Sequence, residues 1–238
     1  MIKLSIVIPC YNEEENLPAL FERFAKSIEK RQAQNQIEVI FVNNGSTDYS
    51  AEVFSKQLQD CSFGRLVEVP VNKGYGYGIL QGLKECKGKY IGWTHADLQT
   101  APDDVLKVLD IINKDETGNL FIKGSRKGRS LFDNFFTVGM SIFESVYLGT
   151  FLYEINAQPN IFPKTFFDKW KNPPYDFALD LHAYYLAKKM NLKLIRFNVN
   201  FPPREHGESK WNTGLKAKFK FIKRTVKFSL ELKKRGIK

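Results

Sequence analysis

The sequence has only three cysteines, Cys10, Cys61 and Cys86, and their spacing fits no metal-binding pattern. An odd number of cysteines without a pattern indicates reduced thiols in an intracellular compartment. No stretch reaches the roughly 18 consecutive apolar residues that a membrane-spanning helix needs. The apolar run at the N-terminus ends at Pro9, too early for a signal peptide. These absences predict a cytoplasmic protein whose contact with a membrane, if it has one, is peripheral.

Positive charge is concentrated at one end of the sequence. The 238 residues include 36 Lys plus Arg and 26 Asp plus Glu, which gives a net charge of +10. Residues 215–238 hold ten basic residues and one acid, so the preceding 214 residues have a net charge of only +1. A nucleic-acid-binding domain carries its basic charge over a whole face. We therefore expect no nucleic-acid partner. A hydrophobic content of 43% excludes a disordered chain.

The first 125 residues alternate short β-branched runs with longer segments of helical spacing. This alternation predicts an α/β fold, a mostly parallel sheet with helices on both faces. We expect further helices at 131–151 and 177–190, and further strands at 161–162 and 192–199. Ligands of such sheets bind at the carboxyl ends of the strands, so we expect the functional residues in the loops there. The expected strands of the first part are 4–8, 38–42, 66–69, 90–93 and 120–122.

Polar or glycine-rich segments follow the first four expected strands. They read PCYNEEEN from Pro9, NNGSTD from Asn43, NKGYGYG from Asn72 and HADLQ from His95. Turns and helix caps explain much of the first three. The glycine-rich segment is neither a P-loop nor a dinucleotide fingerprint. The oxygen and nitrogen donors of HADLQ could converge on a divalent cation that bridges phosphates. The alternative for this segment is a helix start with an ordinary surface aspartate.

Taken in order, these motifs resemble those of the family 2 glycosyltransferases with the GT-A fold. The motifs PxYNE, (D/N)(D/N)GSxD, NxGxG, xADLQ, GSR and PPRxxGESK cover about residues 3–212. Within the family, the sequence is most similar to the dolichyl- and polyprenyl-phosphate sugar transferases. The resemblance implies a GT-A catalytic domain at 1–214. It also implies an inverting transfer of a hexose-type sugar from a UDP- or GDP-sugar to a polyprenyl-phosphate or lipid-linked acceptor, with Mg²⁺ or Mn²⁺ as cofactor.

The resemblance also implies a role for each matched residue. The nucleotide would be bound by Pro9, Tyr11, Glu13, Asn43, Asn44, Asn72 and Gly74. The metal would be bound by Asp97, Gln99 and His95, of which the histidine replaces an acid of the family pattern. The phosphates and the acceptor would be held by Arg126, Arg129, Arg204, Ser209 and Lys210. The residues expected to be catalytic are Asp97, Asp180, Arg126 and Arg204.

Asp180 has two possible roles at this stage. In transfers to a hydroxyl group, an acid at the matching position is the general base. A lipid phosphate is already anionic, so it requires no base, and Asp180 would then position other groups. Two further departures, the amides at Asn43 and Asn44 and the segment 156–162, leave the nucleotide base and the transferred sugar undetermined.

The basic segment 215–238 predicts an amphipathic helix. At about 100° per residue, lysines and an arginine gather opposite an apolar stripe. Such a helix is typical of a protein that lies on an anionic membrane surface. The alternative is that the stripe docks on the catalytic domain. The stripe consists of Leu215, Phe219, Ile222, Val226 and Leu230, with Phe221, Phe228 and Leu232 beside it.

Three functions are compatible with the sequence. The first is a transferase that uses a lipid acceptor and lies peripherally on the cytoplasmic membrane face. The second is a soluble transferase that extends a polysaccharide or a protein glycan, for which Asp180 would be an essential base. The third is a nucleotide-binding protein without catalysis, which the substitutions at His95 and Asn43 suggest.

Overall fold

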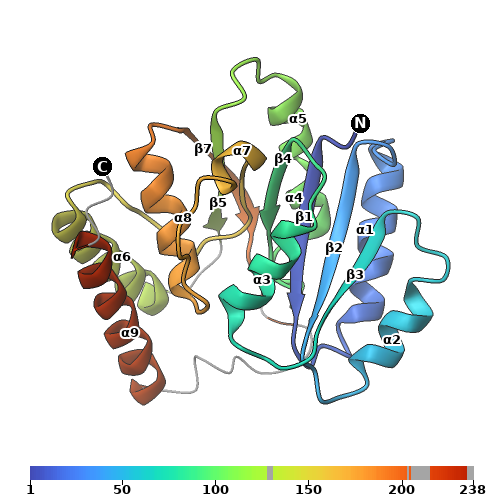
Figure 1. Ribbon diagram of the computed structural model, residues 1–238, viewed down its shortest axis with the longest axis horizontal. Coiled ribbons are helices and arrows are strands. Elements are labelled where there is room, and N and C mark those ends of the chain that lie inside the picture. The colour runs from blue at the N-terminus through green and yellow to red at the C-terminus, as the bar shows by residue number, and fades with distance from the viewer. Residues whose placement is uncertain (128–130, 203, 205–214, 235–238) are drawn as a thin grey trace.

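A computed structural model describes the chain except for residues 128–130, 203, 205–214 and 235–238, and except for the side chains of 131–137 and 215–221. One sheet of seven strands runs through it in the order β3-β2-β1-β4-β6-β5-β7 (Figure 1). The described strand pairs are parallel, apart from those that β6 makes with β4 and β5. The strands are β1 (Leu4–Cys10), β2 (Ile37–Asn44), β3 (Gly64–Val69), β4 (Tyr90–Trp93), β5 (Leu120–Lys127), β6 (Asn160–Pro163) and β7 (Lys193–Asn200).

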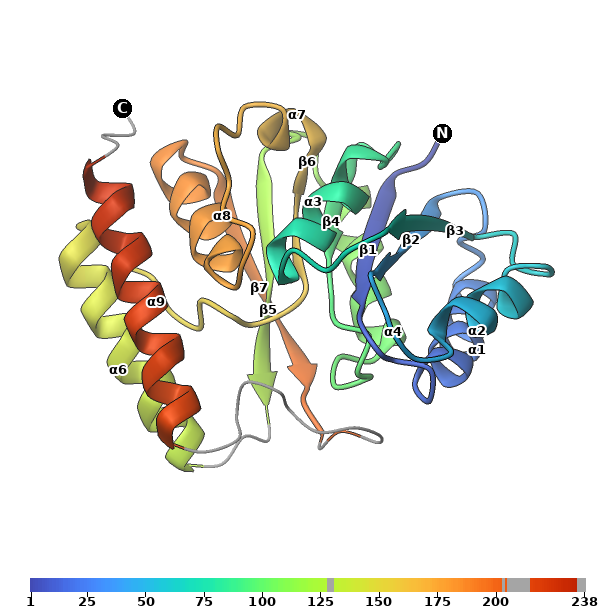
Figure 2. The ribbon, with the colours of Figure 1, turned by 60° about the horizontal axis from the view of Figure 1, so that its bottom comes forward.

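Helices cover both faces of the sheet, which confirms the predicted α/β class (Figures 1 and 2). One face packs against α1 (Leu17–Lys30), α2 (Ser50–Gln57), α4 (Pro102–Leu106) and α5 (Val108–Asn113). The other face packs against α3 (Tyr75–Lys84), α7 (Lys164–Phe167) and α8 (Ala178–Lys189).

Side chains of the central strands alternate between two hydrophobic cores. In β2, Val39 and Phe41 point to the α1 side, whereas Ile40 and Val42 point to the α3 side. All four are fully buried. A strand covered on both faces is apolar along its whole length, which is why the short apolar runs of the sequence correspond to strands.

Two long helices, α6 (Leu131–Leu148) and α9 (Leu215–Lys234), lie side by side at one end of the molecule (Figure 2). Phe228 and Leu232 of α9 are buried in the core that α8 also lines. The Oγ atom of Ser229 donates a hydrogen bond to the Glu144 carboxylate of α6 at 2.5 Å. The alternative considered for the basic segment, docking on the catalytic domain, is therefore observed for part of its apolar side. Among the described helices, none is long and apolar enough to cross a membrane.

Candidate active site

A pocket of about 620 Å³ opens at the carboxyl ends of β1, β2 and β4. β2 and β3 lie on one side of β1 in the sheet, and β4 lies on its other side. The direction in which successive strands are added therefore reverses at β1, next to the pocket. Ligands of open α/β sheets bind in this crevice. Its lining comes from all four predicted loops, with two later residues, Phe177 and Arg204, added. Of the predicted site residues, it contains Pro9, Tyr11, Glu13, Asn44, Asn72, His95, Asp97 and Arg204.

The loops after β1 and β2 are held together by hydrogen bonds from backbone amides to side chains. The Asn12 amide donates to Ser46 Oγ at 3.1 Å, and the Thr47 amide donates to Asn12 Oδ1 at 2.9 Å. The Glu13 amide donates to Ser50 Oγ at 3.1 Å. The motif PxYNE is therefore fixed to the NNGSTD segment, which makes this wall of the pocket rigid.

Gly45 is required where these loops meet the one after β3. Its φ of +69° lies in the left-handed region, and a Cβ atom at this position would stand 2.5 Å from the backbone nitrogen of Asn72. The loop that carries Asn72 can therefore approach the pocket only because residue 45 is glycine.

The two adjacent asparagines of β2 have different positions. Asn44 lines the pocket and donates to the Gly74 carbonyl at 3.2 Å. Asn43 is turned away from the pocket, donates to Glu68 Oε2 at 2.9 Å and accepts from the Ser46 amide. Successive side chains of a strand point to opposite faces, so only one of the two predicted nucleotide contacts lies in the pocket wall. Gly74 serves through its backbone, as an acceptor for Asn44.

Three aromatic side chains, Tyr75, Phe177 and His95, form another part of the pocket lining, which we call the aromatic wall. The ring of Tyr75 stacks on Phe177, with centroids 4.6 Å apart and planes 15° apart, and lies 5.7 Å from the His95 ring. All three residues line the pocket. The sequence does not indicate the contributions of Tyr75 and Phe177, because the stack joins two segments about a hundred residues apart.

Two of the three residues predicted to bind a metal, Asp97 and Gln99, are in contact with Arg204. Its Nη2 atom lies 2.8 Å from Asp97 Oδ2, and its Nε donates to Gln99 Oε1 at 3.3 Å. The backbone amide of Gln99 also donates to Asp97 Oδ1 at 3.2 Å, which fixes the Asp97 carboxylate relative to the Gln99 backbone. Asp97 is 5% exposed. Two of the three predicted donors are thus arranged to hold a cation, and that cation is here the guanidinium of Arg204.

These donors fit a divalent ion by their chemistry. A carboxylate, an amide oxygen and an imidazole within five residues suit Mn²⁺ better than Mg²⁺, which prefers oxygen. Within the described part of the chain, no group of three His, Cys, Asp or Glu side chains surrounds one point. Among the described residues, Asp97 would therefore be the single carboxylate for such a metal, and the metal would compete with Arg204 for it.

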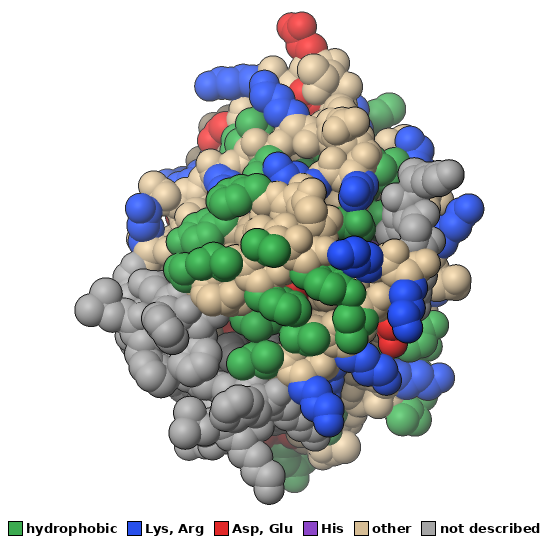
Figure 3. Space-filling view, turned by 90° about the vertical axis from the view of Figure 1, so that its left-hand side faces the viewer, with side chains coloured by type: hydrophobic (Ala, Val, Ile, Leu, Met, Phe, Trp, Pro, Cys, Tyr) green, Lys and Arg blue, Asp and Glu red, His purple; other side chains and the backbone are tan. Residues whose placement is uncertain are grey.

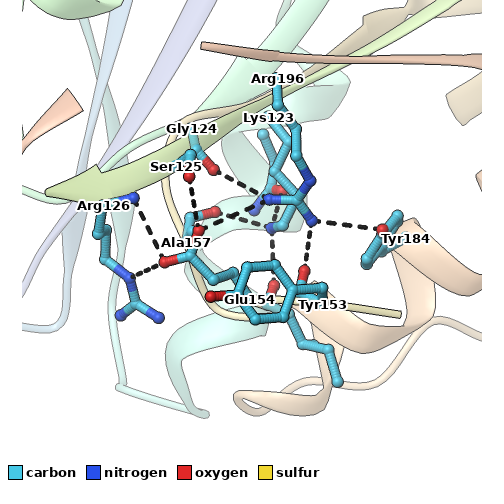
Figure 4. A network of polar contacts seen from close by, with 11 residues as sticks. Lys123, Gly124, Ser125, Arg126, Tyr153, Glu154, Ala157, Tyr184 and Arg196 are labelled. Atoms are coloured by element: carbon cyan, nitrogen blue, oxygen red, sulfur yellow. Dashed lines mark hydrogen bonds and ion pairs between the residues drawn. The ribbon is translucent and has the colours of Figure 1, made fainter. Parts of the chain in front are cut away.

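Arg126 belongs to a second polar cluster, centred on Glu154 (Figure 4). The Glu154 carboxylate pairs with Arg126 Nε at 3.4 Å, accepts from Ser125 Oγ at 2.9 Å and lies 3.8 Å from Arg196. The guanidinium of Arg126 also lies 5.5 Å from the Phe201 ring. Arg126 is thus held by Glu154 and is not part of the pocket lining. Sequence reasoning missed Glu154 because no motif marks it.

Asp180 lies beneath the aromatic wall, outside the pocket lining. Its Oδ1 atom accepts hydrogen bonds from Trp93 Nε1, Gln158 Nε2 and Asn160 Nδ2 at 3.2, 2.6 and 2.8 Å. Gln158 Nε2 also donates to the Tyr75 hydroxyl at 3.3 Å. Burial raises the pKa of Asp180, which is 2% exposed. The carboxylate is linked to the pocket wall through Gln158 and Tyr75, and it also interacts electrostatically with His95, which lines the pocket.

Lys123 is the cationic counterpart of Asp180. Its Nζ atom donates to the carbonyls of Ile155 and Ala157 at 2.7 Å each, and to Asn160 Oδ1 at 2.6 Å. Asn160 thus bridges the two charges. Burial lowers the pKa of Lys123 to about 7. Three acceptors match the three N–H donors of an ammonium group. The sequence does carry one signal for this site: Lys123 stands between the apolar run 120–122 and Gly124, within an expected strand.

Three predicted residues, Arg129, Ser209 and Lys210, lie outside the described residues. Their roles at the acceptor therefore stay predictions.

The chain is a doubly wound α/β protein with amides, acids, stacked rings and an arginine at the switch point of its sheet, which is where such sheets bind their ligands. More narrowly, residues 5–184 match the model of glycosyl transferase family 2, and the chain belongs to this family.

Curated relatives include enzymes named for lipid phosphates. The chain is 28% identical over 224 residues to a dolichyl-phosphate beta-glucosyltransferase of Dictyostelium discoideum, covering 84% of this chain and 66% of the relative. It is 34% identical over 109 residues to an undecaprenyl-phosphate 4-deoxy-4-formamido-L-arabinose transferase of Proteus mirabilis. This match covers 45% of this chain and 32% of the relative. The chain thus spans about two thirds of the first relative and one third of the second.

Solved structures show the same fold. A glucosyl-3-phosphoglycerate synthase of Mycobacterium tuberculosis, in complex with Mn²⁺, UDP and phosphoglyceric acid, matches with a TM-score of 0.70 and 18% identity over 100% of this chain and 80% of its own. A mannosyltransferase of Pyrobaculum calidifontis, in complex with GDP-Man and Mn²⁺, matches with a TM-score of 0.65 and 15% identity. This match covers 86% of this chain and 58% of the mannosyltransferase chain. The GT-A fold expected from the sequence is confirmed.

Proposed function

We propose that this protein is a glycosyltransferase that moves a hexose-type sugar from a nucleotide-sugar to a polyprenyl-phosphate or lipid-linked acceptor. The observation that carries the proposal is the Asp97–Gln99–Arg204 cluster at the switch-point pocket. The names of the dolichyl- and undecaprenyl-phosphate relatives support a lipid phosphate as the acceptor.

The donor would extend across the pocket from the β1 side to Arg204. Pro9, Tyr11 and Asn44 lie where a base and ribose would bind, and their amide and ring groups suit a flat, polar ligand. The diphosphate would lie at Asp97 and Arg204, because a guanidinium binds phosphate oxygens in a bidentate way. Arg204 would then exchange a carboxylate partner for a phosphate partner.

Mg²⁺ or Mn²⁺ is the cofactor that we propose, held by Asp97, Gln99 and His95. When bound, such an ion stabilises the negative charge that grows on the leaving diphosphate. Arg204 would add positive charge at the same place, since its Nη2 atom lies 2.8 Å from Asp97. A contribution of Arg126, which is paired with Glu154 outside the pocket lining, stays a prediction.

In the proposed reaction, a phosphate oxygen of the acceptor attacks the anomeric carbon and the bond to the diphosphate oxygen breaks. Attack from the opposite face inverts that carbon and releases a nucleoside diphosphate. A phosphate nucleophile needs no general base, which agrees with the position of Asp180, buried under Tyr75 with three donors on one oxygen. Asp180 is then a positioning residue for the aromatic wall.

The test is sugar transfer from UDP-glucose and GDP-mannose to a short-chain polyprenyl phosphate, with Mn²⁺ present. We expect Asp97→Ala to abolish transfer, and the control Asp60→Ala, at an exposed surface position, to retain it. Near wild-type transfer by Asp97→Ala would refute the role of the cluster. Transfer to free oligosaccharides but not to polyprenyl phosphate would favour the soluble transferase, and donor binding without any transfer would favour the non-catalytic function.

A further inference from the structure

The outer face of α6 presents large apolar side chains to solvent. Val138, Ile142 and Val146 repeat every four residues and are 41, 60 and 79% exposed. Beside them, Phe143 stacks on Tyr147 with centroids 5.8 Å apart. Side chains four apart lie on one stripe of a helix, so these residues form a continuous ridge. Single exposed apolar residues need no explanation, but a ridge of this kind marks an interaction surface.

Other exposed apolar side chains gather at the same place. Seven of the eleven large hydrophobic residues that are exposed in the described part of the chain lie on α6, on α9 or in the loop after α6. Figure 3 shows hydrophobic side chains gathered on the end of the molecule that these helices form. We call these seven residues the apolar patch: Val138, Ile142, Phe143, Val146, Phe151, Tyr153 and Leu230.

Cations border the patch (Figure 3). The exposed charged side chains described on α9 are all basic, and Lys233 Nζ lies 4.5 Å from the ring of Tyr147 on α6. Among the described side chains of the two helices, the acids are Glu144, which is fully buried, and Glu231, which is partly buried. The exposed basic residues are Lys223, Arg224, Lys227, Lys233 and Lys234.

The two helices start at the edge of the sheet where the pocket opens. β5 ends at Lys127, shortly before α6 begins at Leu131. β7 is parallel to β5 and is the strand that comes before α9, so both strands end at the same edge of the sheet. Both helices run back from that edge (Figure 2). A membrane that lies along α6 and α9 would therefore extend toward the carboxyl edge of the sheet, at which the proposed lipid-phosphate acceptor would reach the pocket.

We propose that the apolar patch rests on an anionic lipid bilayer, with the α6 ridge among the headgroups and the α9 lysines against lipid phosphates. An apolar face with a lysine border is the pattern of interfacial helices. A second copy of this chain fits less well, because a two-fold interface would bring equal rows of lysines together. The inference rests on the proposed function only in that the acceptor is a membrane lipid.

This surface differs from the one that the sequence predicts. The sequence predicts a membrane contact through segment 215–238 alone. Among the described side chains of α9, Phe228 and Leu232 are buried against the protein and Leu230 is 43% exposed, and α6 supplies most of the exposed apolar side chains described on the two helices. The contact is therefore shared, with apolar groups from α6 and positive charge from α9.

The test is flotation of the whole protein with vesicles of 70% phosphatidylcholine and 30% phosphatidylglycerol. We expect the wild type to float, and Ile142→Glu/Val146→Glu to lose at least tenfold in the bound fraction. The matched control is Val71→Glu, which changes an equally exposed residue (64%) away from the patch and should float like the wild type. Charge reversal with Lys227→Glu/Lys233→Glu should also lose binding. Circular dichroism confirms that each variant is folded.

Wild-type flotation by Ile142→Glu/Val146→Glu would overturn the proposal, as would a solution dimer that the same variant abolishes. Transfer to a water-soluble, short-chain polyprenyl phosphate separates this inference from the proposed function. We expect the patch variant to keep that transfer. A wild type that floats but transfers no sugar would refute the proposed function and leave the membrane surface intact.

Discussion

Glu144→Gln should remove a pH dependence of stability that arises between α6 and α9. The Glu144 side chain is fully buried, and Ser229 donates to its Oε2 atom. Its Oε1 atom has no hydrogen-bond partner among the described residues. Burial without compensation disfavours the carboxylate and raises the pKa of Glu144 from the ordinary 4.5 to about 7.

The size of the effect follows from this difference in pKa. Between about pH 4.5 and 7, the folded protein holds a proton on Glu144 that the unfolded chain has lost, so the free energy of unfolding falls as the pH rises through this window. At about 1.36 kcal/mol per pH unit, the loss over the window is at most about 3 kcal/mol. For a chain of this size, it corresponds to roughly 6–12 °C in Tm.

The assay is urea unfolding, followed by tryptophan fluorescence, at several pH values from 4.5 to 8. Glutamine keeps an acceptor for Ser229 but does not ionise, so the variant should be more stable than the wild type at pH 8 and close to it at pH 4.5. Glu116→Gln, at an exposed position, is the control and should keep the wild-type profile. Equal slopes for Glu144→Gln and the wild type between pH 5 and 7 would refute the reasoning.

Three further predictions concern the site. Lys123→Met and Asp180→Leu should each lower the free energy of unfolding by roughly 3–5 kcal/mol, because each leaves a buried charge uncompensated. The double variant should lower it by clearly less than the sum of the two. Additive losses in urea unfolding would show that the two charges do not interact. Arg204→Ala should raise the affinity for Mn²⁺ without nucleotide, since it frees Asp97 and Gln99, and an unchanged Kd in calorimetry would contradict that competition. Gly124→Ala should lower the free energy of unfolding by about 1–3 kcal/mol or more, because a Cβ atom at residue 124 would stand 1.9 Å from the Gln158 carbonyl oxygen. A Tm equal to that of the wild type would exclude this close contact.

Much of the fold could be predicted, because the signals that define it are local. Runs such as residues 39–42 are apolar throughout and follow helical segments, and this is enough to identify a covered parallel strand. The antiparallel insertion of β6 between β4 and β5 could not be predicted. It depends on the order of strands in space, for which residues 160–163 carry no local signal.

The candidate site was predictable as a set of loops, but its contacts were not. The motifs identify Asp97 and Arg204, yet their ion pair joins residues about a hundred positions apart. The sequence also treats Asn43 and Asn44 alike, whereas the pleat of β2 turns one toward Glu68 and the other toward the pocket. The burial of Asp180 depends on Tyr75 and Phe177 packing in front of it, which is a property of the assembled core.

The late position of β7 and α9 in the sequence has a consequence for biosynthesis. β5 pairs with β6 on one side and with β7 on the other, so a nascent chain that has left the ribosome only as far as residue 190 shows a bare strand edge. It also lacks Phe228 and Leu232, which complete the core on the side of α8. Unpaired edges and uncovered apolar surface promote aggregation. Chaperone contacts during translation should therefore be strongest while residues 193–234 are still being made.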